Sequence, residues 1–204
     1  MRLIASLLVL LFLASSSAVG LQVEKFDMRT DRLVARHYRG GKTAAWVKKS
    51  LKADFVTPAG FYGGKTINGR ALRHGVDLTI ANGEEKIPDL FKGRKVLAVY
   101  RTGEVRIFPN YEHCLSWGKP EEAVAGMTIP PRPNERLRRQ FWATKGQFYF
   151  RVTVVGNRWD CLRIARDWGF EHIVHMDGGS SLDRSIVHPS WLAVFRGGLN
   201  NVAS

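Results

Sequence analysis

The chain has 204 residues, of which 45% are hydrophobic and 24% are charged. This balance is ordinary for a globular protein, and the lack of repeats or low-complexity tracts predicts one domain with a sizeable core. The formal net charge of +13 favours an anionic partner such as phosphate or an anionic cell surface, although a solvated basic surface would give the same count.

The N-terminal segment has the pattern of a secretory signal peptide. Arg2 precedes an apolar run over 3–14, and small residues suited to cleavage follow at 16–18. The run is too short for an ordinary membrane span, although an uncleaved anchor is the competing interpretation. We therefore expect a signal peptide over 1–18 and a mature, secreted or periplasmic domain over 19–204. No later segment reaches spanning length, and export argues against nucleic acid as a partner.

Strands are predicted along most of the mature chain. They are expected at 22–27, 32–38, 54–57, 95–101, 104–108, 139–144, 147–155, 170–176 and 191–195. Gly103 and Gly146 mark two hairpin turns. Helices are expected at 43–51 and 157–168, with one or two further helical turns over 120–126. Because strands dominate and helices are few, the sequence predicts an α+β fold, a single domain built on a mostly antiparallel sheet.

The only two cysteines are Cys114 and Cys161. Cys161 falls on the helix predicted at 157–168, and Cys114 falls in a stretch without regular pattern. Their spacing is not that of a metal site, and we expect no metal and no cofactor. In an oxidising compartment they could form a disulfide or stay two buried thiols, and the sequence leaves both open.

The clearest functional signal is the run Asp177-Gly-Gly-Ser-Ser181, directly after the strand predicted at 170–176. Gly178 and Gly179 carry no Cβ, so the backbone can adopt positive φ and a ligand can approach closely. The two serines that follow add hydroxyl groups. An acid at a strand end beside unhindered N–H groups is a common place for chemistry, although an Asp-Gly turn gives the same pattern.

Three segments together resemble the phosphodiester glycosidase family. The helix over 157–168, its stop at Gly169, the next strand and the Asp-Gly-Gly-Ser-Ser run follow in the order found in that family. The segment 53–62 resembles an early strand that ends in Asn-Ala-Gly-Phe-Phe, and 139–156 resembles an arginine segment with the hairpin after it. The resemblance covers most of 23–202, loosely between these anchors.

This sequence departs from the family pattern in two places. Pro58 stands where the family usually has asparagine, and Asn68 is a candidate substitute. Ser180 stands where a third glycine is common. If the missing asparagine binds substrate, the contact is lost here or supplied by another residue.

The resemblance implies a hydrolase that cleaves a sugar-1-phosphodiester, between the anomeric carbon and oxygen, in an envelope or extracellular glycan. An oxocarbenium-like transition state needs a carboxylate near the anomeric centre, for which Asp177 is the candidate. The departing phosphate needs a cation, and Arg139 is the candidate clamp because a guanidinium can engage two phosphate oxygens. Arg136, Arg138 and Arg151 are the other candidates for this clamp.

His175 is the third candidate catalytic residue. It lies two positions before Asp177, so on a strand both side chains would share a face, and it could donate a proton or orient substrate. A core histidine is the alternative. Asp183 could supply a second carboxylate, or it could equally cap or close the loop after the serines. The expected substrate-binding residues are Gly60, Asn68, Gly178, Gly179, Ser180 and Ser181.

A second functional class fits the same features. A non-catalytic module that binds anionic cell-surface polymers would explain both Pro58 and the net charge. In either class the expected partner is a sugar phosphate or an anionic glycan, and the sequence does not indicate the oligomeric state.

Overall fold

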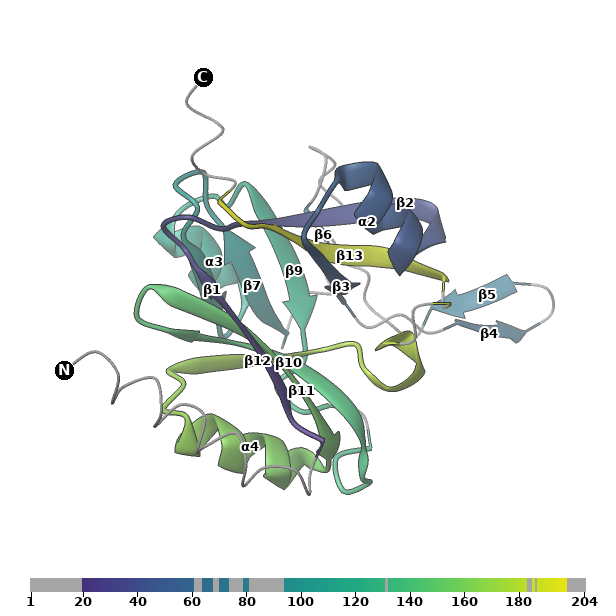
Figure 1. The fold of residues 1–204 in the computed structure, drawn as a ribbon. Coiled ribbons are helices and arrows are strands. Elements are labelled where there is room, and N and C mark those ends of the chain that lie inside the picture. The colour runs from purple at the N-terminus through teal and green to yellow at the C-terminus, as the bar shows by residue number, and fades with distance from the viewer. Residues whose placement is uncertain are drawn as a thin grey trace.

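The structure, a computed structural model, describes residues 20–60, 64–67, 70–73, 79–80, 94–130, 132–182, 185 and 187–197. Within them the chain forms antiparallel sheets and three α-helices, so the predicted α+β class is confirmed (Figure 1). The signal peptide expected at 1–18 lies outside the described residues. Among the helices that the structure describes, none is both long and apolar enough to cross a membrane.

Three sheets and a hairpin contain the strands. The first sheet contains, in spatial order, β1 (Gln22–Asp27), β11 (Phe148–Gly156), β10 (Leu137–Lys145) and β12 (His172–Met176). The second sheet contains β2 (Arg32–Thr43), β13 (Val187–Phe195) and β3 (Phe55–Pro58). The third sheet contains β6 (Thr79–Ile80), β9 (Glu122–Gly126), β7 (Lys95–Val99) and β8 (Val105–Phe108). The separate hairpin contains β4 (Gly64–Ile67) and β5 (Arg70–Arg73).

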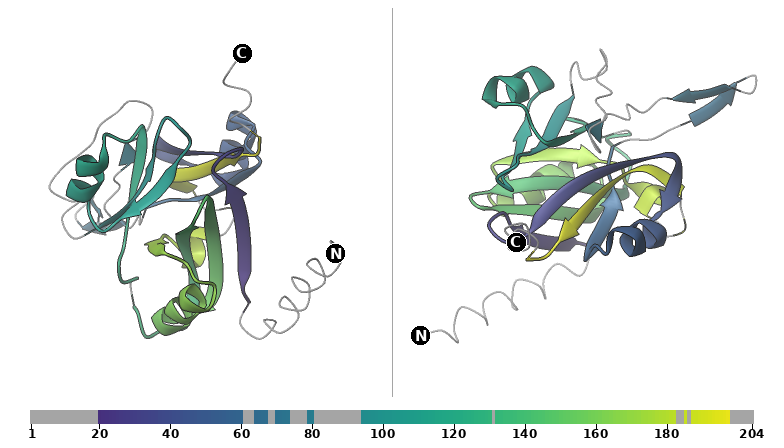
Figure 2. Two further views of the ribbon diagram at one scale, coloured as in Figure 1. Left: turned by 90° about the vertical axis from the view of Figure 1, so that its left-hand side faces the viewer. Right: turned by 90° about the horizontal axis from the view of Figure 1, so that it is seen from above.

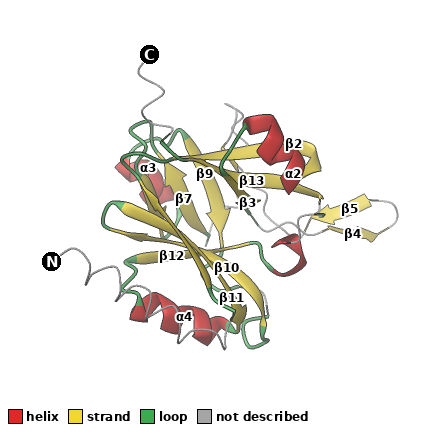
Figure 3. Cartoon of the chain, in the orientation of Figure 1, coloured by secondary structure: helices red, strands yellow, loops and turns green. Residues whose placement is uncertain are grey.

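Each helix packs against one sheet (Figure 3). Helix α2 (Ala44–Leu51) lies on the second sheet, and α3 (Tyr111–Trp117) lies on the third. Helix α4 (Arg158–Asp167) covers the outer face of the first sheet, and its first turn is closed by a capping box between Asn157 and Asp160. The third sheet and α3 lie to one side of the other two sheets (Figure 2).

The first sheet is buried on both faces. On its inner face Phe26 and Trp142 both stack on Tyr149, with ring centroids 5.1 and 5.9 Å from it, inside a cluster shared with the other two sheets. On its outer face Phe141 packs with Ile164 of α4. Successive residues Phe141 and Trp142 therefore face opposite cores, which explains why this strand lacks a polar alternation.

Two predicted elements were wrong. The segment 120–126 was expected to be helical, but β9 pairs along its length with β7, placing Val124 opposite Leu97. Its small apolar side chains fit a buried central strand, and this pairing decides the outcome. The stretch around Cys114 is not irregular but forms α3, capped by the side chain of Asn110. Cys114 and Cys161 are buried free thiols in separate clusters.

Candidate functional site

Strands from two sheets meet at Asp177, the first residue beyond β12. The N–H of Asp177 donates to the carbonyl oxygen of Ala59 at 3.0 Å, and the N–H of Ala59 donates to that of Ser190 at 3.0 Å. The end of β12 is thus joined through the end of β3 to β13. Asp177 is 8% exposed, so its carboxylate is held at a fixed junction with a narrow opening.

The Asp177 carboxylate is paired with a fully buried histidine. Its Oδ2 lies 3.1 Å from His188 Nε2, and its Oδ1 accepts from the N–H of Gly178 at 2.9 Å. His188 Nδ1 lies 2.6 Å from the carbonyl oxygen of Ser190, to which a protonated Nδ1 donates, and 3.1 Å from the backbone N of Ser190, from which a bare Nδ1 accepts. Whether the imidazole is neutral or doubly protonated, the proton on Nε2 faces Asp177, since a bare Nε2 would repel the carboxylate. His188 therefore fixes the orientation of Asp177.

A buried glutamine joins this junction to the neighbouring strands. Gln140 Nε2 donates to the carbonyl oxygens of Pro58, at 2.9 Å, and Asp177, at 3.2 Å. Its Oε1 accepts from Thr57 Oγ1 at 2.5 Å and from Arg151 Nε at 2.8 Å. Both donors and both acceptor sites of the amide are therefore used, which fixes four strands relative to one another.

The two glycines after Asp177 serve different purposes. A Cβ on Gly178 would lie 2.8 Å from the carbonyl oxygen of Arg138 and 3.2 Å from the N of Gln140, so the close approach here is to the backbone of β10. Gly179 has φ +58, and a Cβ there would meet no described atom within 4 Å. Close packing therefore requires glycine at position 178. The positive φ favours glycine at position 179, where open space lies beside the backbone.

That open space belongs to a pocket of about 200 Å³, which we call the Asp177 pocket. It brings together Asp177, Gly178 and Gly179 from the predicted site with Arg132 and Arg138. Its lining also includes Arg139, Gln140, Met176, Leu137 and Pro130. One fixed carboxylate and three arginine residues line the pocket, so it suits a substrate with a negatively charged group.

Arg139 lies in the wall of this pocket, but its guanidinium is engaged elsewhere. It donates to the carbonyl oxygens of Gly156 at 2.9 Å, Arg132 at 2.6 Å and Glu135 at 2.7 Å. Burial lowers the pKa of Arg139 below its ordinary value. In this arrangement Arg139 fastens the loop over 132–135 to the sheet, whereas its neighbour Arg138 is exposed and also lines the pocket.

His175 is not brought to the Asp177 carboxylate. Its ring packs edge-on against Phe141 on the outer face of the first sheet, with centroids 6.0 Å apart. Neither ring nitrogen has a hydrogen-bond partner among the described residues. Burial, with smaller contributions from the charges of Arg139, Lys95 and Arg158, lowers the pKa of His175 to about 3. The predicted shared face fails because the chain leaves β12 at Asp177 and turns its carboxylate to β13.

Of the other predicted site residues, only Gly60 is placed beside Asp177 with its surroundings described. Gly60 is buried directly after Ala59, beside the main chain of Asp177. Ser180 and Ser181 lie in the short 3-10 turn η2 (Gly179–Leu182), but their side chains are outside the description. Asn68 and Asp183 also lie outside the described residues.

Sequence reasoning missed His188 and Gln140. His188 lies 11 residues after Asp177, and no spacing rule pairs it with an acid across the intervening turn. Gln140 gave a usable signal, since a lone amide before Phe141 and Trp142 in a buried strand must find hydrogen-bond partners. Among the residues that the structure describes, no three His, Cys, Asp or Glu side chains are grouped as a metal site requires.

Comparisons with known proteins show similarity at the level of fold. No protein-family model and no curated protein sequence matches the chain. The auto-inhibited catalytic domain of zebrafish N-acetylglucosamine-1-phosphodiester alpha-N-acetylglucosaminidase aligns with a TM-score of 0.53 at 10% identity, over 87% of this chain and 83% of that chain. A hypothetical protein from Synechocystis aligns with a TM-score of 0.47 at 12% identity, over 86% of this chain and 59% of that chain. The resemblance drawn from sequence is thus supported as a distant fold relationship.

Proposed function

We propose that this protein is an exported hydrolase that cleaves a sugar-1-phosphodiester between the anomeric carbon and oxygen. The observation that carries the proposal is the Asp177 carboxylate, oriented by His188 and Gly178, in a pocket that Arg138 also lines. The similar zebrafish domain is named for action on an N-acetylglucosamine-1-phosphodiester, which supports the same reaction class.

The proposed chemistry assigns one task to each group. Asp177 stabilises positive charge at the anomeric carbon or takes the proton of the attacking water. As the carbon–oxygen bond breaks, its electron pair passes to the phosphate oxygen, and Arg138 faces the charge that develops there. A phosphate monoester, with a second pKa of about 6, leaves without strong protonation, so one carboxylate is sufficient. His188 acts as a positioning residue for Asp177.

Pro58 favours a second candidate function. It replaces the asparagine of the resembling family at the end of β3, and its carbonyl is occupied by Gln140. A chain without that amide and with a net charge of +13 could bind anionic cell-surface polymers without turnover. Such a module would show salt-sensitive binding and release no sugar.

A panel of α- and β-linked sugar-1-phosphodiesters, assayed for released sugar, tests the proposal. We expect turnover of at least one by the wild type, its loss in Asp177→Asn, and its retention in Asp167→Asn, a matched change at an exposed acid of α4. Circular dichroism of each variant checks the fold. Turnover would reject the binding-only function, and full activity in Asp177→Asn would reject the assignment of the carboxylate.

A further inference from the structure

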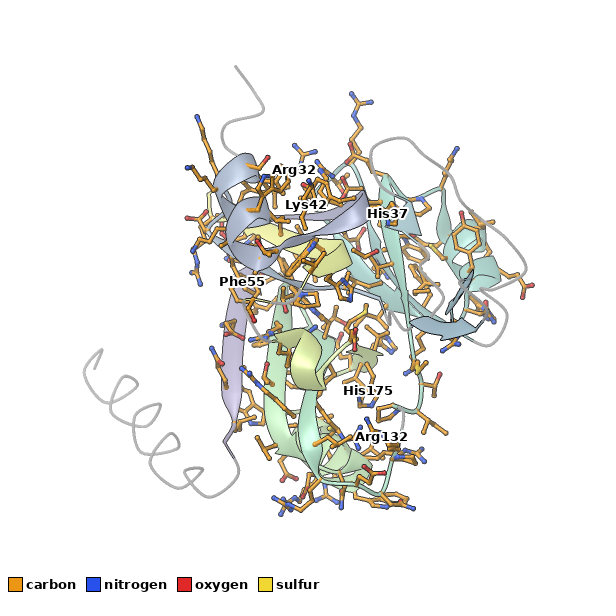
Figure 4. The ribbon with its side chains drawn as sticks, turned by 90° about the vertical axis from the view of Figure 1, so that its right-hand side faces the viewer. Arg32, His37, Lys42, Phe55, Arg132 and His175 are labelled. Carbon is orange, nitrogen blue, oxygen red and sulfur yellow. The ribbon has the colours of Figure 1, made fainter. Side chains whose placement is uncertain are left out.

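A second cleft, of about 350 Å³, opens beside the Asp177 pocket. We call it the α2 cleft, because the first residues of α2 line it together with β3, β10 and β11. Turn η2 borders both spaces, giving Gly179 to the pocket and Leu182 to the cleft, and Arg138 lines both. Figure 4 looks onto this junction, with Phe55 on one side of the turn and Arg132 on the other.

The described lining of the α2 cleft is cationic. Lys48, Arg138 and Arg151 line it, and no carboxylate does. Arg151 is 6% exposed, and its Nη1 lies 3.2 Å from each carboxylate oxygen of Glu24. Its Nε donates to Gln140, so the bonds that Arg151 makes to described residues run through Nε and Nη1 and none through Nη2. A nearly buried guanidinium thus keeps one donor for a ligand in the cleft.

The start of α2 adds a second, independent attraction for anions. Ala44 and Ala45, its first two residues, line the cleft, and their small side chains leave the backbone accessible. The Thr43 side chain accepts only from the N–H of Trp46, and the first turn contains no acidic residue. The unpaired N–H groups and the positive end of the helix dipole both favour a bound anion.

We propose that the α2 cleft binds a phosphate group of the substrate other than the phosphate at the cleaved bond. The preferred substrate is then a glycan with successive phosphodiesters, one in each space, on either side of Arg138. This proposal rests on the proposed function only in placing the phosphate of the cleaved bond in the Asp177 pocket. The phosphate-binding role of the cleft can be tested without turnover.

Calorimetric titration of the full chain with inorganic phosphate, and separately with glucuronate, tests the binding site. Lys48→Glu should weaken phosphate binding by roughly tenfold, because a favourable charge becomes a repulsive one. Lys49→Glu is the matched control, since Lys49 is exposed on the same helix but does not line the cleft. Equal weakening by both variants, no phosphate binding, or equally tight glucuronate binding would overturn the proposal.

Kinetics then separate this proposal from the proposed function. The ratio of kcat/KM for a substrate with two successive phosphodiesters to that for one with a single phosphodiester should exceed one. Lys48→Glu should lower that ratio by roughly tenfold and Lys49→Glu should not. If no substrate is turned over while phosphate binding still depends on Lys48, the proposed function fails and the anion site stands. If both are turned over with an unchanged ratio in Lys48→Glu, the cleft proposal fails alone.

Discussion

Two buried histidines, His188 and His175, show how little burial alone says about function. Both are at most 1% exposed and both lie in strands. His188 has polar neighbours at both ring nitrogens and faces the carboxylate of Asp177. His175 has an aromatic neighbour and no described partner at either nitrogen. The first ring makes polar contacts on both sides, whereas the second is packed among apolar side chains of the core.

The difference arises where the chain leaves the sheet. Until Met176 the strand β12 places alternate side chains on opposite faces of the first sheet, and His175 joins the outer one. At Asp177 the main chain pairs instead with Ala59, so the carboxylate turns toward His188 of the second sheet. The pair of Asp177 and His188 thus forms between two sheets, where a periodic pattern within one strand cannot predict it.

The same substitution in both histidines should separate their roles most strongly. His188→Phe should lower kcat by roughly 10²-fold on a sugar-1-phosphodiester, because Asp177 loses its orienting partner. His175→Phe should change kcat less than about threefold, since an aromatic ring keeps the contact with Phe141. Steady-state kinetics on variants with unchanged circular dichroism would decide, and equal losses of kcat would break the comparison. A change confined to KM in His188→Phe would also contradict its positioning role.

The glutamine behind Asp177 should matter most for stability. Gln140→Leu would leave its buried partners, the carbonyl oxygens of Pro58 and Asp177 and the Nε of Arg151, without these hydrogen bonds. The expected loss in the free energy of unfolding is about 3–5 kcal/mol. Gln147→Leu, in the exposed turn between β10 and β11, should change it by less than about 0.5 kcal/mol. Urea unfolding of the two variants measures the difference. Similar losses in the free energy of unfolding would show that the hydrogen bonds of Gln140 do not stabilise the fold.

The pH dependence of stability should trace back to His175. Its pKa is about 3 in the folded protein against an ordinary 6.5, so below pH 6.5 the unfolded state binds a proton that the folded state does not. Stability should therefore fall as the pH drops toward 3, by up to about 1.4 kcal/mol per pH unit from this residue. His175→Phe should remove that part of the slope. The measurement is the difference in unfolding free energy between pH 7.5 and pH 4.5 for the wild type and for His175→Phe. An equal difference in the two proteins would contradict the assignment to His175.

The smallest expected effects distinguish the two glycines beside Asp177. Gly178→Ala should cost about 1–3 kcal/mol and reduce activity, because the new methyl group presses on the β10 backbone. Gly179→Ala should cost about 1 kcal/mol through its positive φ alone, with no clash. Thermal and urea unfolding compare the two. If Gly179→Ala lost more unfolding free energy than Gly178→Ala, the backbone conformation at Gly179, rather than packing at Gly178, would shape the pocket.

Local patterns in the sequence predicted much of the fold. Both hairpins, the capped helix α4 and the strand before Asp177 follow from periodicity, turn glycines and capping residues. Strand β9 did not, because its short apolar run is decided by pairing with β7, far away in sequence.

The candidate site was predictable only in part. Asp177, Gly178 and Gly179 stand together in the sequence and stay together in the pocket. The partners contributed by other strands, His188 and Gln140, depend on the register between sheets, which no local pattern contains. The sequence also favours Arg139 over Arg138 as the phosphate clamp, because no periodic pattern sets the path of the loop over 132–135, whose carbonyl oxygens accept from Arg139.

The proposed function requires that water attacks the sugar and not the phosphate, with Asp177 at the reacting carbon. Hydrolysis of a sugar-1-phosphodiester in ¹⁸O-labelled water tests this directly, with the phosphate product analysed by mass spectrometry. Cleavage of the carbon–oxygen bond by the wild type should leave the phosphate unlabelled, and Asp177→Asn should form almost no product. A labelled phosphate would show attack at phosphorus and contradict the account.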